Sequence, residues 1–229
     1  MYVKSFREGF KLHYGNIEEY TVLALLPSYL ERDGSSLIVM VDQLIKDSKK
    51  EESGFYLNDY PGLSEKLKRL DAEGEKILLI GVSFALLDLT GAFQFNLNNT
   101  IVMETGGMKG RRKELIRDEL HQLLKNGFGV DKIHSEYGMT ELLSQGYSKG
   151  DGIFTTPPWL RVYMRDTEDA LQLVPEGVTG GINVIDLANH NSCPFIATQD
   201  LGKKLDENHF EILGRFDTSD IRGCNLMVF

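Results

Sequence analysis

Short apolar runs alternate with stretches of helical periodicity from residue 20 to residue 141. Four of these runs predict strands and lie at residues 21–26, 77–80, 100–103 and 132–137. Short runs of this kind are typical of parallel strands that are covered by helices on both faces. The pattern therefore predicts a mostly parallel sheet in this part of the chain.

Between these runs, apolar residues recur three and four positions apart and predict three helices. The first stripe follows the capping candidates Ser35 and Ser36, the second follows Pro61, and Gly127 is expected to close the third. The stripes are Leu37, Met40, Val41, Leu44 and Ile45; Leu63, Leu67 and Leu70; and Ile116, Leu120, Leu123 and Leu124.

After Glu141 the pattern changes, because turn-forming residues recur every few positions and helical periodicity disappears. The runs at 181–187, 195–198 and 209–213 alternate or are apolar throughout, which indicates antiparallel strands. The expected fold class is therefore α/β: a mostly parallel sheet flanked by helices, followed by a β-rich subdomain like a distorted barrel. We expect an α/β subdomain at residues 1–146 and a β-rich subdomain at residues 147–229.

Composition narrows the class of protein. The 229 residues carry 25 Lys and Arg against 34 Asp and Glu, a net charge of −9, and the pI is about 5.1. This balance opposes binding to nucleic acid or anionic lipid at long range. No apolar run approaches the roughly 20 residues of a membrane span, and two cysteines without C-x-x-C spacing favour a reducing compartment. We expect a cytoplasmic protein.

The chain begins inside a helix-like pattern of Val3, Phe6 and Phe10, with no cap or turn before it. Helices seldom begin so abruptly. This pattern predicts that further sequence precedes Met1.

A glycine-containing basic segment, Glu-Thr-Gly-Gly-Met-Lys-Gly-Arg-Arg-Lys at residues 104–113, follows a predicted strand and opens a predicted helix. Gly106 and Gly107 would let a ligand approach the backbone, and free N–H groups at a helix start favour anions. Two interpretations fit these residues: an anion site, or a solvated basic helix end.

The segment from Ser135 to Glu141 lies at the carboxyl end of the last predicted parallel strand, where open α/β sheets bind their ligands. Tyr137 could stack on a base, Thr140 could hydrogen-bond a phosphate oxygen, and Glu141 could hold magnesium through its carboxylate. By composition alone, a polar strand end and turn explains the same residues.

Three motifs in this chain together resemble those of the adenylate-forming enzymes. They are Tyr137-Gly138-Met139-Thr140-Glu141, Thr198-Gln199-Asp200 and Gly214-Arg215-Phe216-Asp217, in the order in which that superfamily has them. Within the superfamily the chain is similar to the acyl-protein synthetases, the fatty-acid-activating component of bacterial bioluminescence reductase complexes. Residues 23–32, 103–112, 134–145 and 221–227 carry that resemblance, which covers the C-terminal two-thirds of the family's length.

The resemblance implies roles for individual residues. Tyr137 would stack on adenine within a nucleotide-binding motif that includes Gly138, and Thr140 would contact the α-phosphate. Glu141 would bind Mg²⁺, Asp200 the ribose, and Arg215 the ribose or phosphate.

The remaining roles fall on the glycine pair and on the end of the chain. Gly106 and Gly107 would line the acyl and adenine pocket, and Asp217 would form a hinge. Cys224 would accept the acyl group from AMP as a thioester, a step that suits a thiolate nucleophile. The implied cofactors are ATP and Mg²⁺, the implied substrate is a fatty or other carboxylic acid, and the implied partner is a reductase.

Two departures from the family pattern leave other interpretations open. No Ser/Thr/Gly-rich phosphate loop occurs in the chain, and Gln199 stands where most superfamily members carry Gly. A truncated or degenerate family member would bind nucleotide or a partner without completing adenylation. A serine esterase is a further alternative, because Gly81-Val82-Ser83-Phe84-Ala85 imitates a nucleophile elbow, although a helix N-cap explains Ser83 more simply.

Overall fold

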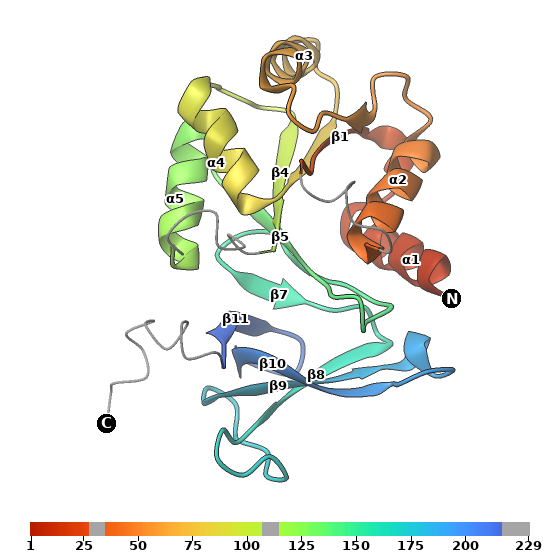
Figure 1. Cartoon of the computed structure of the whole chain (residues 1–229), viewed down its shortest axis with the longest axis vertical. Helices are drawn as coiled ribbons and strands as arrows, with labels where there is room; N and C mark the ends of the chain where they lie inside the picture. The colour runs from red at the N-terminus through yellow and green to blue at the C-terminus, as the bar shows by residue number, and fades with distance from the viewer. Residues whose placement is uncertain (28–34, 107–114, 217–229) are drawn as a thin grey trace.

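The computed structural model describes residues 1–27, 35–106 and 115–216, and within them the strands form one sheet (Figure 1). Eleven strands follow one another in the spatial order β2-β1-β3-β4-β5-β6-β7-β11-β10-β9-β8. Neighbouring strands are parallel from β2 to β5 and antiparallel from β5 to β8. The sheet therefore changes from parallel to antiparallel pairing at β5.

The parallel strands are β1 (Thr21–Leu25), β2 (Gly54–Phe55), β3 (Ile77–Gly81), β4 (Thr100–Thr105) and β5 (His134–Tyr137). Every residue of β1 and β3 is buried, as expected for strands covered on both faces. These positions confirm the predicted parallel sheet and add the short edge strand β2, which has no apolar run to announce it.

Helices lie on both sides of the parallel strands, with α1 and α2 on one side and α4 and α5 on the other (Figure 1). Ser35 caps α2 by accepting a hydrogen bond from the Ile38 amide, and Pro61 lies in the first turn of α3. The helices are α1 (Tyr2–Tyr14), α2 (Ser36–Ser48), α3 (Tyr60–Ala72), α4 (Ser83–Ala92) and α5 (Arg117–Phe128), with single 3₁₀ turns η1 (Ile17–Glu19) and η2 (Leu187–Asn189).

Helix α5 differs from its prediction at both ends. Ile116 precedes the helix and is 64% exposed, and Leu123 is 47% exposed, so the buried stripe is narrower than expected. The left-handed residue that ends α5 is Gly129, with φ of 66°, and not Gly127. Gly127 instead faces α4, where a Cβ atom would lie 2.4 Å from the Cβ of Thr90.

Helix α4 was not predicted, because it is buried on nearly all sides. Seven of its ten residues are buried, so no polar face marks its period. Val82 occupies the N-cap position and Ser83 is the first helical residue. Ser83 is therefore not the N-cap that its sequence context suggested.

The antiparallel strands extend the same sheet through the β5–β6 pair. The antiparallel prediction after Glu141 is thus confirmed, but within the described residues the sheet stays open and is not closed into a barrel. These strands are β6 (Gly146–Ser148), β7 (Ile153–Thr155), β8 (Leu160–Arg165), β9 (Thr179–Asp186), β10 (Phe195–Lys204) and β11 (Phe210–Arg215).

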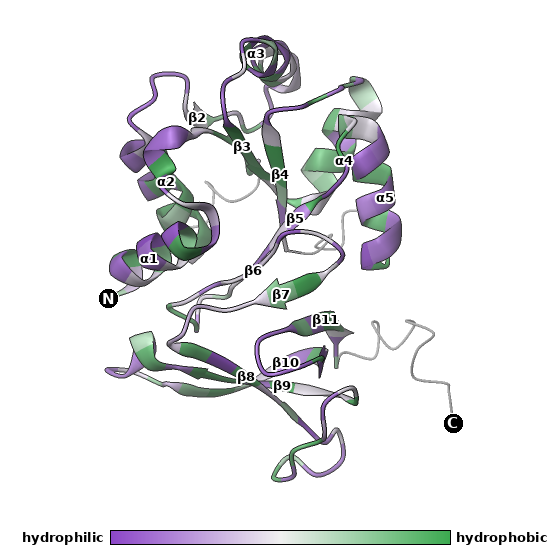
Figure 2. Ribbon diagram, turned by 180° about the vertical axis from the view of Figure 1, so that it is seen from behind, coloured by the Kyte–Doolittle hydropathy of each residue, from purple (hydrophilic) through white to green (hydrophobic). Residues whose placement is uncertain are grey.

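Two clusters of buried apolar side chains stabilise the molecule. The larger one surrounds the parallel strands. The helices that cover these strands carry both hydrophobic residues and hydrophilic residues (Figure 2). The smaller one lies on the antiparallel strands and consists of Leu142, Phe154, Leu160, Val162, Met164, Ile182, Val184 and Phe210. The subdomain boundary between residues 146 and 147 stays a prediction.

Among the described residues, no helix is both long and apolar enough to cross a membrane.

Candidate functional site

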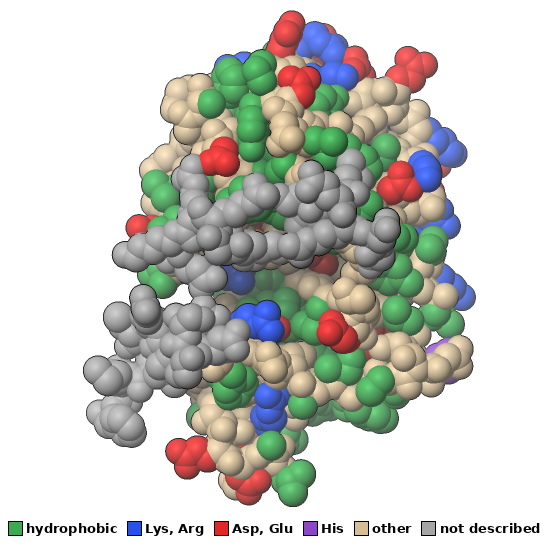
Figure 3. Space-filling model, viewed as in Figure 1, with side chains coloured by type: hydrophobic (Ala, Val, Ile, Leu, Met, Phe, Trp, Pro, Cys, Tyr) green, Lys and Arg blue, Asp and Glu red, His purple; other side chains and the backbone are tan. Residues whose placement is uncertain are grey.

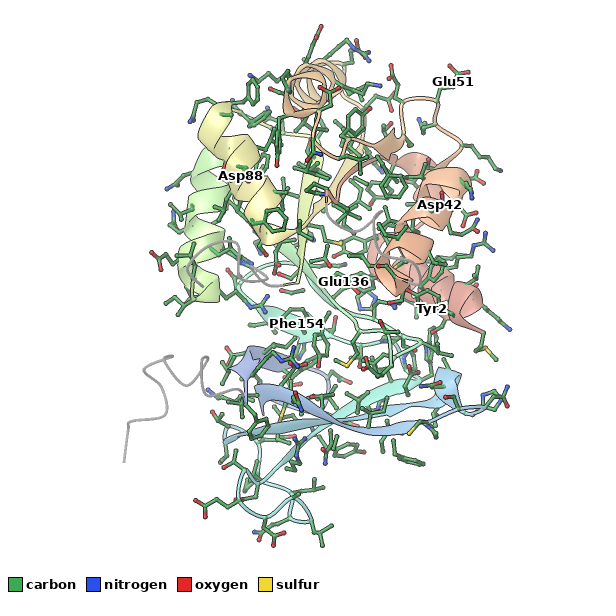
Figure 4. All side chains as sticks on the ribbon, viewed as in Figure 1. Tyr2, Asp42, Glu51, Asp88, Glu136 and Phe154 are labelled. Atoms are coloured by element: carbon green, nitrogen blue, oxygen red, sulfur yellow. The ribbon has the colours of Figure 1, made fainter. Side chains whose placement is uncertain are left out.

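The carboxyl ends of β4 and β5 lie side by side, since the two strands are parallel neighbours. Gly106 directly follows β4, and Tyr137 ends β5. The surface is hollowed between the helical part and the antiparallel strands (Figure 3), at the level where Glu136 and Phe154 lie (Figure 4). This edge is where open α/β sheets bind ligands.

Tyr137, Asp200 and Arg215 meet at this edge although they come from three strands. The Tyr137 hydroxyl donates to Asp200 Oδ2 at 2.7 Å across 63 residues of sequence. Arg215 Nε lies 3.7 Å from Asp200 Oδ1, because β10 and β11 pair Asp200 with Arg215. The structure thus brings together one residue from each of the three sequence motifs.

The Tyr137 ring is half-buried against two aromatic side chains. Its centroid lies 6.3 Å from those of Phe154 and Phe210, with the rings edge to face. Burial, together with the nearby Asp200 carboxylate, raises the pKa of the Tyr137 hydroxyl. The hydroxyl therefore keeps its proton and remains a donor.

Asp200 lies where the pairing of β10 with β9 changes register, between Ala197 and Leu201. Such irregularities redirect side chains near sites. The Thr198 hydroxyl holds this segment by accepting from the Asp200 amide at 3.1 Å and donating to the Ile182 carbonyl at 3.0 Å. Gln199 takes part as well, since its Oε1 accepts from Arg215 at 3.3 Å.

Gly138, Thr140 and Glu141 follow β5 and are exposed. Within the described residues, the Glu141 carboxylate has no ion-pair partner. Magnesium in nucleotide sites is commonly held by one or two carboxylates together with phosphate oxygens and water. A single exposed carboxylate fits that arrangement, and the described residues contain no cluster of three or more His, Cys, Asp or Glu that would hold a metal by itself.

Asp186 anchors the turn that carries Thr140 and Glu141. Its buried carboxylate accepts from the Leu143 amide at 2.8 Å and from the amide and hydroxyl of Ser144 at 3.0 and 2.7 Å. Asn189 adds a bond from its side-chain amide to the Glu141 carbonyl at 2.8 Å. Neither residue was predicted from the sequence, because these partners lie more than 40 positions away.

Ser83 does not have the surroundings of an esterase nucleophile. It is 1% exposed, and its hydroxyl donates to Gly106 O at 2.6 Å and to Glu104 Oε2 at 3.1 Å. A serine triad needs a histidine between the serine and the acid. Here the acid, Glu104, contacts the serine directly through Oε2. His121 is not between them, because its Nε2 lies 3.6 Å from the other carboxylate oxygen, Oε1.

Glu136 is a titratable group at the site to which the sequence motifs assign no role. Burial raises its pKa to about 7, a hydrogen bond with Thr105 opposes the rise, and the Glu104 charge adds to it. Its Oε1 lies 2.4 Å from the position that a Cβ on Gly138 would occupy, so it fills the space beside that glycine.

Three predicted site residues, Gly107, Asp217 and Cys224, lie outside the described residues. Their expected roles in the pocket, hinge and acyl transfer stay predictions.

Comparison with known proteins places the chain in a family. A family model described as acyl-protein synthetase, LuxE, matches residues 59–229. No curated protein matches the chain.

Solved structures share the fold at low sequence identity. An ATP-bound RpMatB-BxBclM chimera is 18% identical with a TM-score of 0.62, over 90% of this chain and 42% of its own. Apo MatB from Rhodopseudomonas palustris is 19% identical with a TM-score of 0.61, over the same shares. The anthranilate CoA ligase AuaEII with anthranoyl-AMP is 14% identical with a TM-score of 0.59, over 89% and 40%. The chain thus has the fold of adenylate-forming enzymes and spans about two-fifths of their length.

Proposed function

Because the chain belongs to the acyl-protein synthetase family, we propose that it activates a carboxylic acid, such as a fatty acid, with ATP and transfers the acyl group to its own Cys224. The observation that supports this most is the convergence of Tyr137, Asp200 and Arg215 beside the exposed Thr140 and Glu141. An aromatic ring, a carboxylate and a guanidinium at one strand edge suit the base, ribose and phosphate of a nucleotide.

The reaction has two steps. A carboxylate oxygen of the acid attacks the α-phosphorus of ATP, and the bond to pyrophosphate breaks, which yields acyl-AMP. The Cys224 thiolate then attacks the acyl carbonyl carbon, and AMP leaves with the bonding electron pair. The resulting thioester stays activated for transfer to a reductase partner.

Each described site residue has a role that its geometry allows. Tyr137 would stack on adenine, Asp200 would accept hydrogen bonds from the ribose hydroxyls, and Arg215 would contact ribose or phosphate. Thr140 would donate to the α-phosphate, while Gly106 lets the nucleotide approach the backbone and Gly138 leaves room for the Glu136 carboxylate beside it. Mg²⁺ bound at Glu141 would neutralise phosphate charge.

The lack of a phosphate loop in these residues favours a second candidate function. The 229 residues hold no Ser/Thr/Gly-rich segment that would grip the β- and γ-phosphates, so by themselves they could bind nucleotide or acyl-AMP and act in transfer without forming the adenylate. We propose the cytoplasm as its location in either case, on the evidence of its composition.

One labelling experiment separates the two functions. The purified chain is incubated with radiolabelled fatty acid, ATP and Mg²⁺, and hydroxylamine-sensitive label is measured in the unsubstituted chain and in Cys224→Ser, with Cys193→Ser as the matched control. Label that is lost only in Cys224→Ser supports the full reaction. Label that appears only with preformed acyl-AMP supports transfer without adenylation. No label either with fatty acid, ATP and Mg²⁺ or with preformed acyl-AMP would contradict acyl transfer to Cys224.

A further inference from the structure

Five polar side chains that the proposed reaction does not use lie together behind Gly106. Four of them are at most 7% exposed, and the side chain of the fifth, Arg117, is 27% exposed. They come from the β3–α4 junction, β4, β5 and α5. The members are Ser83, Glu104, Arg117, His121 and Ser135.

Glu104 lies at the centre of this cluster. Its Oε1 is 3.0 Å from an Arg117 Nη and 3.6 Å from His121 Nε2, and its Oε2 accepts from Ser83 at 3.1 Å. Burial opposes ionisation of Glu104, but the nearby His121 ring and the Arg117 charge outweigh it and hold its pKa below the ordinary value. A buried carboxylate with partners on both oxygens has one defined position.

Ser83 extends this fixed position to the backbone that leaves β4. Its single hydroxyl proton is shared between Glu104 and the Gly106 carbonyl, and the carbonyl oxygen is the nearer acceptor at 2.6 Å. Gly106 is exposed and has φ of 69°, in the left-handed region. A glycine there has many alternative conformations, so the bond from Ser83 removes freedom that packing does not.

We propose that Ser83, oriented by Glu104, is a positioning residue that holds the Gly106 carbonyl and so fixes the backbone edge of the nucleotide site. This inference rests on the proposed function, because it takes Gly106 to face the nucleotide. Fixing a loop before the ligand arrives lowers the entropy cost of binding. Ser83, whose sequence context imitates a nucleophile elbow, would thus position the backbone of the nucleotide site and would not act as a nucleophile.

The first measurement is the affinity for AMP, by calorimetric titration of the full chain. Loss of one hydrogen bond that preorganises the site should raise the Kd of Ser83→Ala about 5- to 10-fold. Ser83→Cys keeps a weak donor, so its Kd should lie between those of the unsubstituted chain and Ser83→Ala. Thr90→Val is the matched control, because it removes another buried hydroxyl of α4 whose acceptors, the Leu86 and Leu87 carbonyls, belong to the same helix. It should leave the Kd unchanged.

A second measurement tests the hydrogen bond itself. In a chain labelled with carbonyl-¹³C, ¹⁵N-glycine, only glycine pairs give a carbonyl–nitrogen cross-peak, and the sequence holds two pairs, Gly106-Gly107 and Gly180-Gly181. Ser83→Ala should shift the Gly106 carbonyl upfield and leave the Gly180 peak in place. Thr90→Val should move neither peak.

The outcomes separate this inference from the proposed function. If the unsubstituted chain binds AMP and Ser83→Ala binds it equally well, or if the Gly106 peak does not move, the positioning role is overturned and the proposed function stands. If the unsubstituted chain binds neither AMP nor acyl-AMP, the proposed function is overturned, and the positioning role falls with it.

Discussion

Tyr137 contributes two different groups to the site, a ring and a hydroxyl, and they can be separated. Tyr137→Phe keeps the ring but leaves Asp200 without its 2.7 Å donor, so we expect the Kd for AMP to rise about 3- to 10-fold. Tyr137→Ala should weaken binding further, because stacking of a base on an aromatic ring contributes about 1–3 kcal/mol.

Tyr163→Phe is the matched control for this pair, since Tyr163 is 37% exposed on the edge strand β8. An equal loss of affinity in Tyr163→Phe, or no loss in Tyr137→Ala, would contradict the stacking role of Tyr137.

Glu136 should make stability depend on pH. Between its ordinary pKa of 4.5 and its folded pKa of about 7, the unfolded chain loses the proton first. Its contribution to the free energy of unfolding therefore falls as pH rises through this interval and is constant above it. Glu136→Gln should remove this contribution. From pH 5 to pH 8, the free energy of unfolding of the unsubstituted chain should therefore fall by about 1–3 kcal/mol more than that of Glu136→Gln.

Urea unfolding at both pH values measures this difference. Glu141→Gln, a change of an exposed carboxylate in the same motif, should show no comparable difference. A Glu136→Gln chain whose stability parallels that of the unsubstituted chain at both pH values would show that Glu136 titrates normally.

At this scale the motifs predicted candidate site residues but not the residues that hold them in place. Tyr137, Asp200 and Arg215 were predicted from their motifs, and the structure brings them together, although nothing in their local patterns indicates that they meet. Their roles stay predictions. Glu104 and Asp186 were missed, because a carboxylate in a strand has the same local pattern whether it is solvated or buried. Its burial depends on donors from distant elements, here Arg117 and Ser144.

Among the elements, α4 and α5 depend on a close contact at Gly127. Any Cβ at this position would overlap the Thr90 side chain at 2.4 to 3.0 Å. Gly127→Ala should therefore lower the free energy of unfolding by about 1–3 kcal/mol, as overpacking does. Gly91→Ala in α4 is the control, because a Cβ there meets nothing within 4 Å.

The two alanine variants should move stability in opposite directions. Alanine is favoured over glycine inside helices by about 0.5–1 kcal/mol, so Gly91→Ala should be neutral or stabilising in urea unfolding. A stabilising Gly127→Ala would show that the helices separate without cost.

Helices with an exposed polar face were predicted from the sequence, whereas the nearly fully buried helix was not. Helices α2 and α3 have one apolar face and clear caps, and their positions were predicted correctly. Helix α4 has no polar face, so its sequence contained no helical period to detect. The continuation of the sheet across β5 and β6 depends on strand pairing, which hydrophobic patterns do not determine.

At the scale of the whole molecule, Asp186 joins the antiparallel strands to the turn that carries Thr140 and Glu141. Asp186→Ala removes the acceptor of three hydrogen bonds from Leu143 and Ser144. Leaving buried donors unpaired costs about 1–3 kcal/mol each, so we expect a loss of several kcal/mol in unfolding and a weaker affinity for AMP.

Asp166→Ala tests the specificity of this effect, because Asp166 also accepts from two amides, those of Glu168 and Asp169, but in an exposed turn. It should change stability by less than about 1 kcal/mol and leave AMP binding unaltered. Equal effects of the two substitutions would contradict an anchoring role for Asp186.

The place of β11 in the sheet has a consequence for synthesis on the ribosome. It lies between β7 and β10 but follows both in the sequence. Until residues 210–215 have emerged, the nascent chain holds two separate pieces of sheet, with Tyr137 on one and Asp200 on the other. The proposed nucleotide site is therefore incomplete on the growing polypeptide, and a nucleotide bound there would stabilise the protein only after its last described strand has been made.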